Sequence, residues 1–114
     1  MKKKYRIKSN NEIQSLMQKK QTVGNSYFII YYYKNHENNN FRFAISVSKK
    51  YGNAVERNLM KRRLREIIRF LDIKQNYDFF IIAKLKSKIL NFEDIKKNIK
   101  NLLNKANILK GGRI

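Results

Sequence analysis

The strongest constraint on the fold is a helical pattern that begins after a turn at residue 52. Gly52 gives that turn a permissive backbone, and Asn53 is a cap-type residue followed three positions later by Glu56, the spacing of a capping box. No Pro or Gly interrupts the pattern before Leu71, so we predict a helix over 54–71. At about 100° per residue its apolar side chains fall on one stripe that can pack on a core. The stripe comprises Met60, Leu64, Ile67, Ile68 and Leu71.

A neighbouring face of this helix is cationic. Its polar side chains form an arc of Arg57, Asn58, Lys61, Arg62, Arg65 and Arg69. Like charges four residues apart destabilise an isolated helix by a few tenths of a kcal/mol each, and Glu66 lies on a third side with Arg63. The arc is either a solvated basic face or a site for a polyanion. The net charge of +19 and the preference for Arg, which holds phosphate bidentately, favour the polyanion site.

The composition narrows the choice of polyanion. The chain has 114 residues, 27 Lys and Arg against eight Asp and Glu, and a pI near 10.3. Such a field attracts nucleic acids and acidic membranes, but Trp is absent and the apolar stripes are needed for a core, so we expect nucleic acid and no membrane partner. No secretion signal or membrane span is expected. Because cysteine is absent, disulfides and thiolate metal sites are excluded. This absence is compatible with a reducing cytosol but does not demand it, and we expect a cytoplasmic protein.

The segment before this helix predicts an arm, a helix and two strands. Residues 1–8 form a basic arm that is either frayed or contacts phosphate through Arg6. Cap-type residues at 9–11 begin a short helix to about Lys20, with Ile13 and Met17 on one face, and core packing is their default role. Aromatic and β-branched residues predict a strand over 27–33, and clean alternation predicts another over 41–48.

The second strand has one face of small and polar residues. Phe41, Phe43, Ile45 and Val47 would face the core, and the opposite face would carry Arg42, Ala44, Ser46 and Ser48. This face is either simply solvated or a floor for a nucleic-acid strand. Tyr31 on the adjacent strand offers a stacking surface, and Lys49 and Lys50 extend a positive rim with Arg42 and Arg6.

The last third of the chain predicts a buried strand over 77–83 and a helix capped by Asn91. That helix has an apolar stripe and would end at Gly111-Gly112, leaving a tail over 110–114. No composition break or repeat divides residues 1–114. We therefore expect one α+β domain of order αββαβα, a helix-covered sheet.

Catalysis by this chain alone is not expected. His36, the only histidine, lies in an Asn-rich loop. The acids are scattered, without the clustered carboxylates of a two-metal nuclease, at Glu12, Glu37, Glu56, Glu66, Asp72, Asp78, Glu93 and Asp94. We expect no catalytic residue, and the sequence leaves metal ligands unknown.

The stretch from Ser46 to Arg65 resembles a known family. Ser46-Val-Ser-Lys-Lys, then Gly52-Asn-Ala-Val, then Arg57-Asn58 followed by Lys61-Arg62 and Arg65, is similar in order and spacing to the signature of the bacterial ribonuclease P protein component. The flanking pattern fits across nearly the whole chain. Leu59 stands where the third residue of that family's Arg-Asn-Arg hallmark is Arg.

The resemblance implies a function and a fold. The chain would be the non-catalytic protein subunit of an endoribonuclease, with ribonuclease P RNA and precursor tRNA as partners and Mg²⁺ held mainly by the catalytic RNA. No obligate protein partner is evident. The fold would be similar to the second domain of ribosomal protein S5, with a left-handed strand–helix–strand crossover where the general rule expects a right-handed one.

The resemblance also implies a cleft for the 5′ leader of precursor tRNA. Its lining would include Ile13, Met17 and Tyr31, with Arg42, Ser46 and Ser48 from the small-residue face. Ile13 and Met17 are aliphatic where the family often has aromatic residues. We therefore expect an apolar surface opposite Tyr31, without aromatic stacking from the helix. One alternative is a structural RNA binder of the ribosomal kind, which composition alone fits equally well and only the constellation of Arg57, Asn58, Lys61 and Arg62 disfavours. The other alternative is a DNA architectural protein.

Overall fold

The computed structural model describes residues 3–111. A four-stranded sheet lies at the centre of this fold. The strand order is β1-β2-β4-β3. The strands are β1 (Thr22–Gly24), β2 (Phe28–Lys34), β3 (Arg42–Val47) and β4 (Tyr77–Ala83). The helices are α1 (Asn10–Gln18), α2 (Ala54–Phe70) and α3 (Phe92–Lys105), with short 3₁₀ turns η1 (Lys3–Tyr5), η2 (Lys49–Tyr51) and η3 (Leu85–Ile89).

Strand β4 is the centre of the sheet. It pairs antiparallel with β2, from Phe28 opposite Ala83 to Lys34 opposite Tyr77. It pairs parallel with β3, and α2 connects β3 to β4, as the predicted strand–helix–strand unit requires. The α+β fold with a helix-covered sheet is confirmed, whereas the left-handed sense of the crossover stays a prediction.

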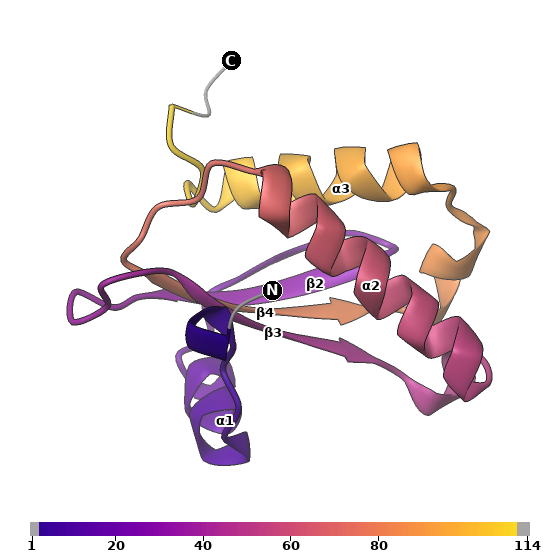
Figure 1. The fold of residues 1–114 in the computed structure, drawn as a ribbon, viewed down its shortest axis with the longest axis horizontal. Coiled ribbons are helices and arrows are strands. Elements are labelled where there is room, and N and C mark those ends of the chain that lie inside the picture. Colours follow the sequence, from indigo (N-terminus) through magenta and orange to yellow (C-terminus); the bar gives the residue numbers. More distant parts are fainter. Residues whose placement is uncertain (1–2, 112–114) are drawn as a thin grey trace.

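The helices cover the two faces of the sheet unequally. In Figure 1, α2 and α3 cover one face of the sheet, and α1 lies alone on the other. Alternation along the strands directs Phe28, Ile30, Phe43, Phe79 and Ile81 towards α2 and α3, and these five side chains are almost completely buried. The α1 face has a smaller cluster of its own, with Ile7, Leu16 and Phe80 at its centre. The main core therefore leaves the α1 face free to carry a site.

The caps of the helices follow the sequence closely. Ser9 begins α1, and its hydroxyl oxygen accepts from the backbone N–H groups of Asn11 and Glu12. Asn53 and Glu56 form the predicted capping box at the start of α2. Gly52 is extended there, at φ 165°, so its role is not conformational freedom. A Cβ at this position would instead collide with the Glu56 carboxylate, which lies against the Gly52 backbone to complete the box.

Two elements differ from the sequence prediction. Strand β1 was not predicted, because it is only three residues long and adds an edge to β2 at a Gly-containing segment with a weak strand pattern. Helix α3 ends at Lys105, not at Gly111-Gly112. Asn107 adopts a left-handed φ of 61°, and the chain turns back to bury Ile108 and Leu109 in the main core. Residues 112–114, which include Gly112 and most of the predicted tail, lie outside the described part.

The described helices are all too short or too polar to cross a bilayer.

Candidate nucleic-acid interface

Helix α2 buries its apolar stripe and turns its cationic arc outward. Met60, Leu64, Ile67 and Ile68 are buried in the main core, as predicted. The residues of the arc differ in exposure: Asn58, Arg62 and Arg69 are exposed, whereas Arg57, Lys61 and Arg65 are half-buried. Lys61 and Arg65 lie on the side of α2 that faces β3, because they line one hollow together with Phe43, Ala44 and Ile45 of that strand.

The charge of this arc is almost uncompensated. Arg69 approaches Glu66 at 3.7 Å, but within residues 3–111 the side chains of Arg57, Lys61, Arg62 and Arg65 form no ion pair with an acid. Burial lowers the pKa of the Arg65 guanidinium, and the nearby charges of Arg6 and Arg62 lower it further. Cations held together without acids are stabilised by an anionic ligand.

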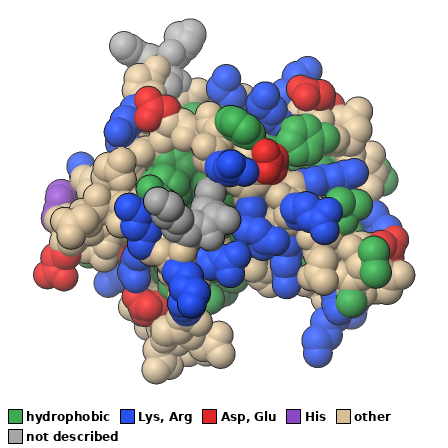
Figure 2. Space-filling view, in the orientation of Figure 1, with side chains coloured by type: hydrophobic (Ala, Val, Ile, Leu, Met, Phe, Trp, Pro, Cys, Tyr) green, Lys and Arg blue, Asp and Glu red, His purple; other side chains and the backbone are tan. Residues whose placement is uncertain are grey.

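The N-terminal arm contributes to the same surface. From residue 3 onward it is not frayed: Arg6 forms a parallel bridge with Phe43, and the Ile7 N–H donates to the Phe43 carbonyl oxygen at 2.9 Å. Ile7 is buried, which fixes the arm along the outer edge of β3 and leaves Arg6 exposed beside α2. Figure 2 shows Lys and Arg side chains gathered along α2 towards the N-terminal segment.

A hollow of about 230 Å³ lies where the arm, α1, β3 and α2 meet. Three cations surround it, namely Arg6, Lys61 and Arg65. Its remaining lining is almost entirely apolar and comprises Ile7, Ile13, Phe43, Ala44 and Ile45. The sequence identified each cation separately, and the fold joins them into one open site with an apolar floor and a positive rim.

The predicted cleft residues on the α1 face also come together. Ile13 and Met17 project from α1 into the small cluster, and Tyr31 packs there from β2. The Tyr31 ring stacks beside the Phe80 ring with centroids 6.5 Å apart. Ile13 lines the cationic hollow as well, so the small cluster adjoins the hollow at this residue.

Sequence reasoning missed part of the cleft floor. Phe80 and Ile82 project from β4 into this face, and Ile7 covers it from the arm. The signal was present, because alternation along β4 divides its residues between two faces, but a strand that is apolar apart from Asp78 was interpreted only as buried. Lys19 was missed too; its ammonium lies 4.5 Å from the centre of the Tyr33 ring at the far end of α1.

Four predicted residues line the end of β3. Ser46 is half-buried, and the Ser48 hydroxyl oxygen accepts from the Lys50 N–H at 3.2 Å and so caps η2. Lys49 and Lys50 are exposed in η2, just before α2 begins. They place two further positive charges near the N-terminus of α2, while Arg6 lies beside Lys61 and Arg65 further along the helix.

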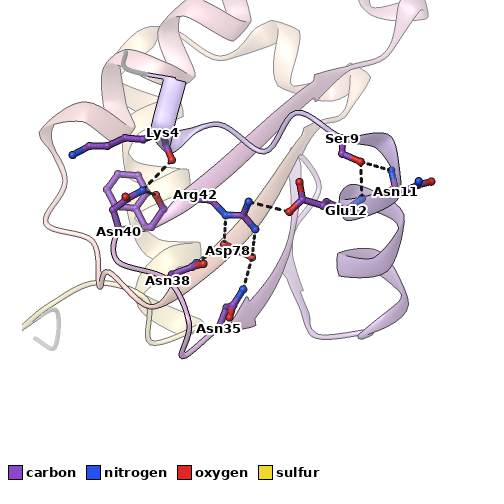
Figure 3. A network of polar contacts seen from close by, with 10 residues as sticks. Lys4, Ser9, Asn11, Glu12, Asn35, Asn38, Asn40, Arg42 and Asp78 are labelled. Atoms are coloured by element: carbon purple, nitrogen blue, oxygen red, sulfur yellow. Dashed lines mark hydrogen bonds and ion pairs between the residues drawn. The ribbon is translucent and has the colours of Figure 1, made fainter.

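Arg42 is placed differently from the prediction. Its guanidinium is not free on the rim, because Asp78 on β4 and Glu12 on α1 both bind it (Figure 3). Hydrogen bonding to Asp78 raises the pKa of Arg42 above its ordinary value. One hint of this arrangement was present in the sequence, since Asp78 is a charge inside an otherwise apolar strand and a buried charge requires partners.

Comparisons with known proteins match this architecture. The family model described as Ribonuclease P matches residues 1–107, from the basic arm through α3. A ribonuclease P protein component of Acholeplasma laidlawii is 46% identical over 111 residues, which cover 96% of this chain and 95% of the relative. One from Bacillus cereus is 44% identical over 101 residues, covering 87% of this chain and 88% of the relative.

The chain belongs to the ribonuclease P protein family.

Solved ribonuclease P proteins share the fold. The Staphylococcus aureus protein is 36% identical with a TM-score of 0.84, and the alignment covers 93% of this chain and 98% of that one. The Thermotoga maritima protein is 26% identical with a TM-score of 0.79, over 88% of this chain and 96% of that one. The arm, α1, β3 and α2, which build the hollow, therefore belong to a shared ribonuclease P protein architecture.

Proposed function

We propose that this chain is the protein subunit of a ribonuclease P holoenzyme, in which RNA carries out the cleavage. The subunit binds the catalytic RNA through the cationic arc of α2 and holds the 5′ leader of precursor tRNA in the cleft beside α1. The holoenzyme then hydrolyses the phosphodiester that joins the leader to the mature 5′ end of the tRNA. The contribution of the protein is electrostatic and geometric.

The observation that carries the proposal is the uncompensated cation cluster around the hollow. Arg6, Lys61 and Arg65 come from segments far apart in the sequence and meet over an apolar floor. The described part of the chain gives none of the three an acidic partner. Two RNAs can approach each other only when the repulsion between their phosphates is screened. Lys and Arg side chains of a bound protein neutralise phosphates and release the counterions that were condensed on the RNA.

The cleft supports a role for an unpaired strand. Its wall is aliphatic at Ile13 and Met17, and Tyr31 presents a half-buried ring opposite them. Stacking of a base on an aromatic ring contributes about 1–3 kcal/mol and tolerates any sequence. A leader whose sequence varies from one tRNA to another suits such a surface. Holding the leader beside the cations would orient the scissile bond relative to the catalytic RNA.

The side chains of this chain do not fit a protein-only magnesium site. Across residues 3–111, no three His, Asp or Glu side chains gather closely enough to hold a metal ion. The two carboxylates on the α1 face, Glu12 and Asp78, are both bound to Arg42. We propose that Mg²⁺ is held mainly by the RNA subunit.

Reconstitution tests the proposal. Purified protein is added to ribonuclease P RNA at a Mg²⁺ concentration too low for the RNA alone, and cleavage of precursor tRNA is followed. The expected result is stimulation of cleavage at the 5′ end of the mature tRNA, with no cleavage by the protein alone. Absence of stimulation would instead favour a structural RNA binder, and tighter binding to duplex DNA than to RNA in parallel titrations would favour a DNA architectural protein.

A further inference from the structure

The side chain of Asp78 is an anchored carboxylate in the middle of the sheet. The residue is only 7% exposed, yet it receives four hydrogen bonds. Asn35 and Asn38 donate side-chain N–H groups to it at 3.3 and 2.6 Å. Arg42 donates from Nε at 3.2 Å and from Nη2 at 3.0 Å. A carboxylate fixed by two amides holds this bidentate guanidinium in one orientation.

The remaining edge of the Arg42 guanidinium reaches α1. Its Nη1 lies 2.9 Å from the Glu12 carboxylate in the first turn of that helix (Figure 3). Glu12 directly precedes Ile13, which forms part of the cleft wall. In the described residues, this ion pair is the only hydrogen-bonded side-chain link between α1 and the sheet.

Helix α1 has few other directional contacts with the sheet, and the one described above is that of Lys19 with the Tyr33 ring at the C-terminal end of the helix. It packs through Leu16, Ile13 and Met17 on a small cluster that is separate from the main core. Apolar contacts are non-directional, so they hold the helix on the sheet without fixing its rotation. A bidentate, anchored guanidinium supplies the missing direction.

We propose that Arg42 is a positioning residue that sets the width of the leader cleft. Asp78 anchors Arg42, Arg42 holds Glu12, and Glu12 fixes the distance of Ile13 and Met17 from Tyr31. The inference rests on the proposed function of the cleft. It assigns Arg42 a role other than phosphate binding, because two carboxylates around one guanidinium leave a local charge that does not attract phosphate.

The decisive variant is Glu12→Ala, which breaks the link while adding a unit of positive charge to the protein. In the reconstituted holoenzyme we expect it to weaken binding of leader-bearing precursor tRNA about 1.5-fold to fivefold, the range that partly exposed ion pairs reach. Binding of mature tRNA should not change. Glu37→Ala is the matched control, because Glu37 is exposed in a loop and its removal changes the net charge equally. It should alter neither affinity.

Arg42→Lys tests the geometry. Lysine keeps the charge but cannot hold Asp78 bidentately while reaching Glu12. We expect it to lose leader affinity as Glu12→Ala does, and the double variant to lose no more than Arg42→Lys alone. Tighter or unchanged leader binding by Glu12→Ala would overturn the proposal, since it would mean that releasing Arg42 from Glu12 is harmless or frees it for phosphate. Additive losses in the double variant would overturn it too.

A measurement without RNA separates this inference from the proposed function. The chain has no cysteine, so Gln14→Cys on α1 and Lys97→Cys on α3, both exposed, accept a pair of spin labels. Pulsed electron resonance should give one narrow distance distribution, which Glu12→Ala broadens and Glu37→Ala does not. An equally narrow distribution with Glu12→Ala would refute the positioning role. If the unmodified holoenzyme fails to distinguish precursor from mature tRNA, the proposed cleft function fails, while the spin-label result still decides the role of Arg42.

Discussion

Replacing the two α2 cations at the hollow should change the salt dependence of RNA binding in a predictable way. Each phosphate that a protein neutralises contributes about 0.7 to the slope of log affinity against log salt for single strands and about 0.9 for duplexes. Lys61 and Arg65 both line the hollow, where Arg6 completes the rim. Lys61→Gln with Arg65→Gln should therefore reduce the magnitude of the slope by roughly 1.4 to 1.8 for binding to ribonuclease P RNA.

The matched control is a second pair on the outer side of the molecule. Lys97 and Lys100 are exposed on α3, and replacing both with Gln removes the same two charges from a protein of net charge +19. Fluorescence anisotropy titrations at several KCl concentrations give both slopes. The α3 pair should leave the slope nearly unchanged. Equal reductions by the two pairs would refute the reasoning, because binding would then depend on net charge and not on the hollow.

Three further predictions concern the cleft, the core and a helix cap. Tyr31→Ala should weaken holoenzyme binding of leader-bearing precursor tRNA by about 1–3 kcal/mol and leave mature tRNA unaffected, whereas equal losses for both would exclude a leader contact. Leu64→Ala, at a completely buried position, should lower the free energy of unfolding in urea by about 2–5 kcal/mol, whereas Val55→Ala, 77% exposed, should change it by less than about 0.5; similar losses would contradict the assigned core. The backbone N–H of Asn53, and then Lys88, lower the pKa of Glu56, so its contribution to stability is complete above its ordinary pKa and is lost as the pH falls through the lowered value. Stability measured by thermal unfolding should thus depend less on acidic pH in Glu56→Gln, and an unchanged dependence would show that the capping carboxylate is not the group involved.

Local sequence signals predicted the elements that depend on local physics. The capping box of Asn53 and Glu56, the uninterrupted helix behind it and the alternation along β3 are each determined within a few residues, and each was predicted near its observed position. The end of α3 could not be predicted in the same way. The preference of Ile108 and Leu109 for the main core ends that helix before the glycines are reached, and this is a tertiary effect.

The candidate site divides along the same line. Periodicity placed Lys61 and Arg65 on one face of a helix, but only the bridge between Arg6 and Phe43 brings the arm beside them. The alternation of residues along β3 places Arg42 on the face away from the main core, which is why it was predicted to belong to the positive rim. Its two acidic partners come from α1 and β4, 30 positions before it and 36 after it, and no local pattern pairs residues at such separations.

Site-specific crosslinking tests the central claim most directly. A photoreactive group attached at Ser46→Cys, on the α1 face of β3, and at Lys97→Cys, on the opposite layer, can be compared in the reconstituted holoenzyme because the chain has no other cysteine. The account predicts that the Ser46→Cys probe crosslinks to the 5′ leader of bound precursor tRNA and the Lys97→Cys probe does not. Leader crosslinks from Lys97→Cys, with none from Ser46→Cys, would contradict it.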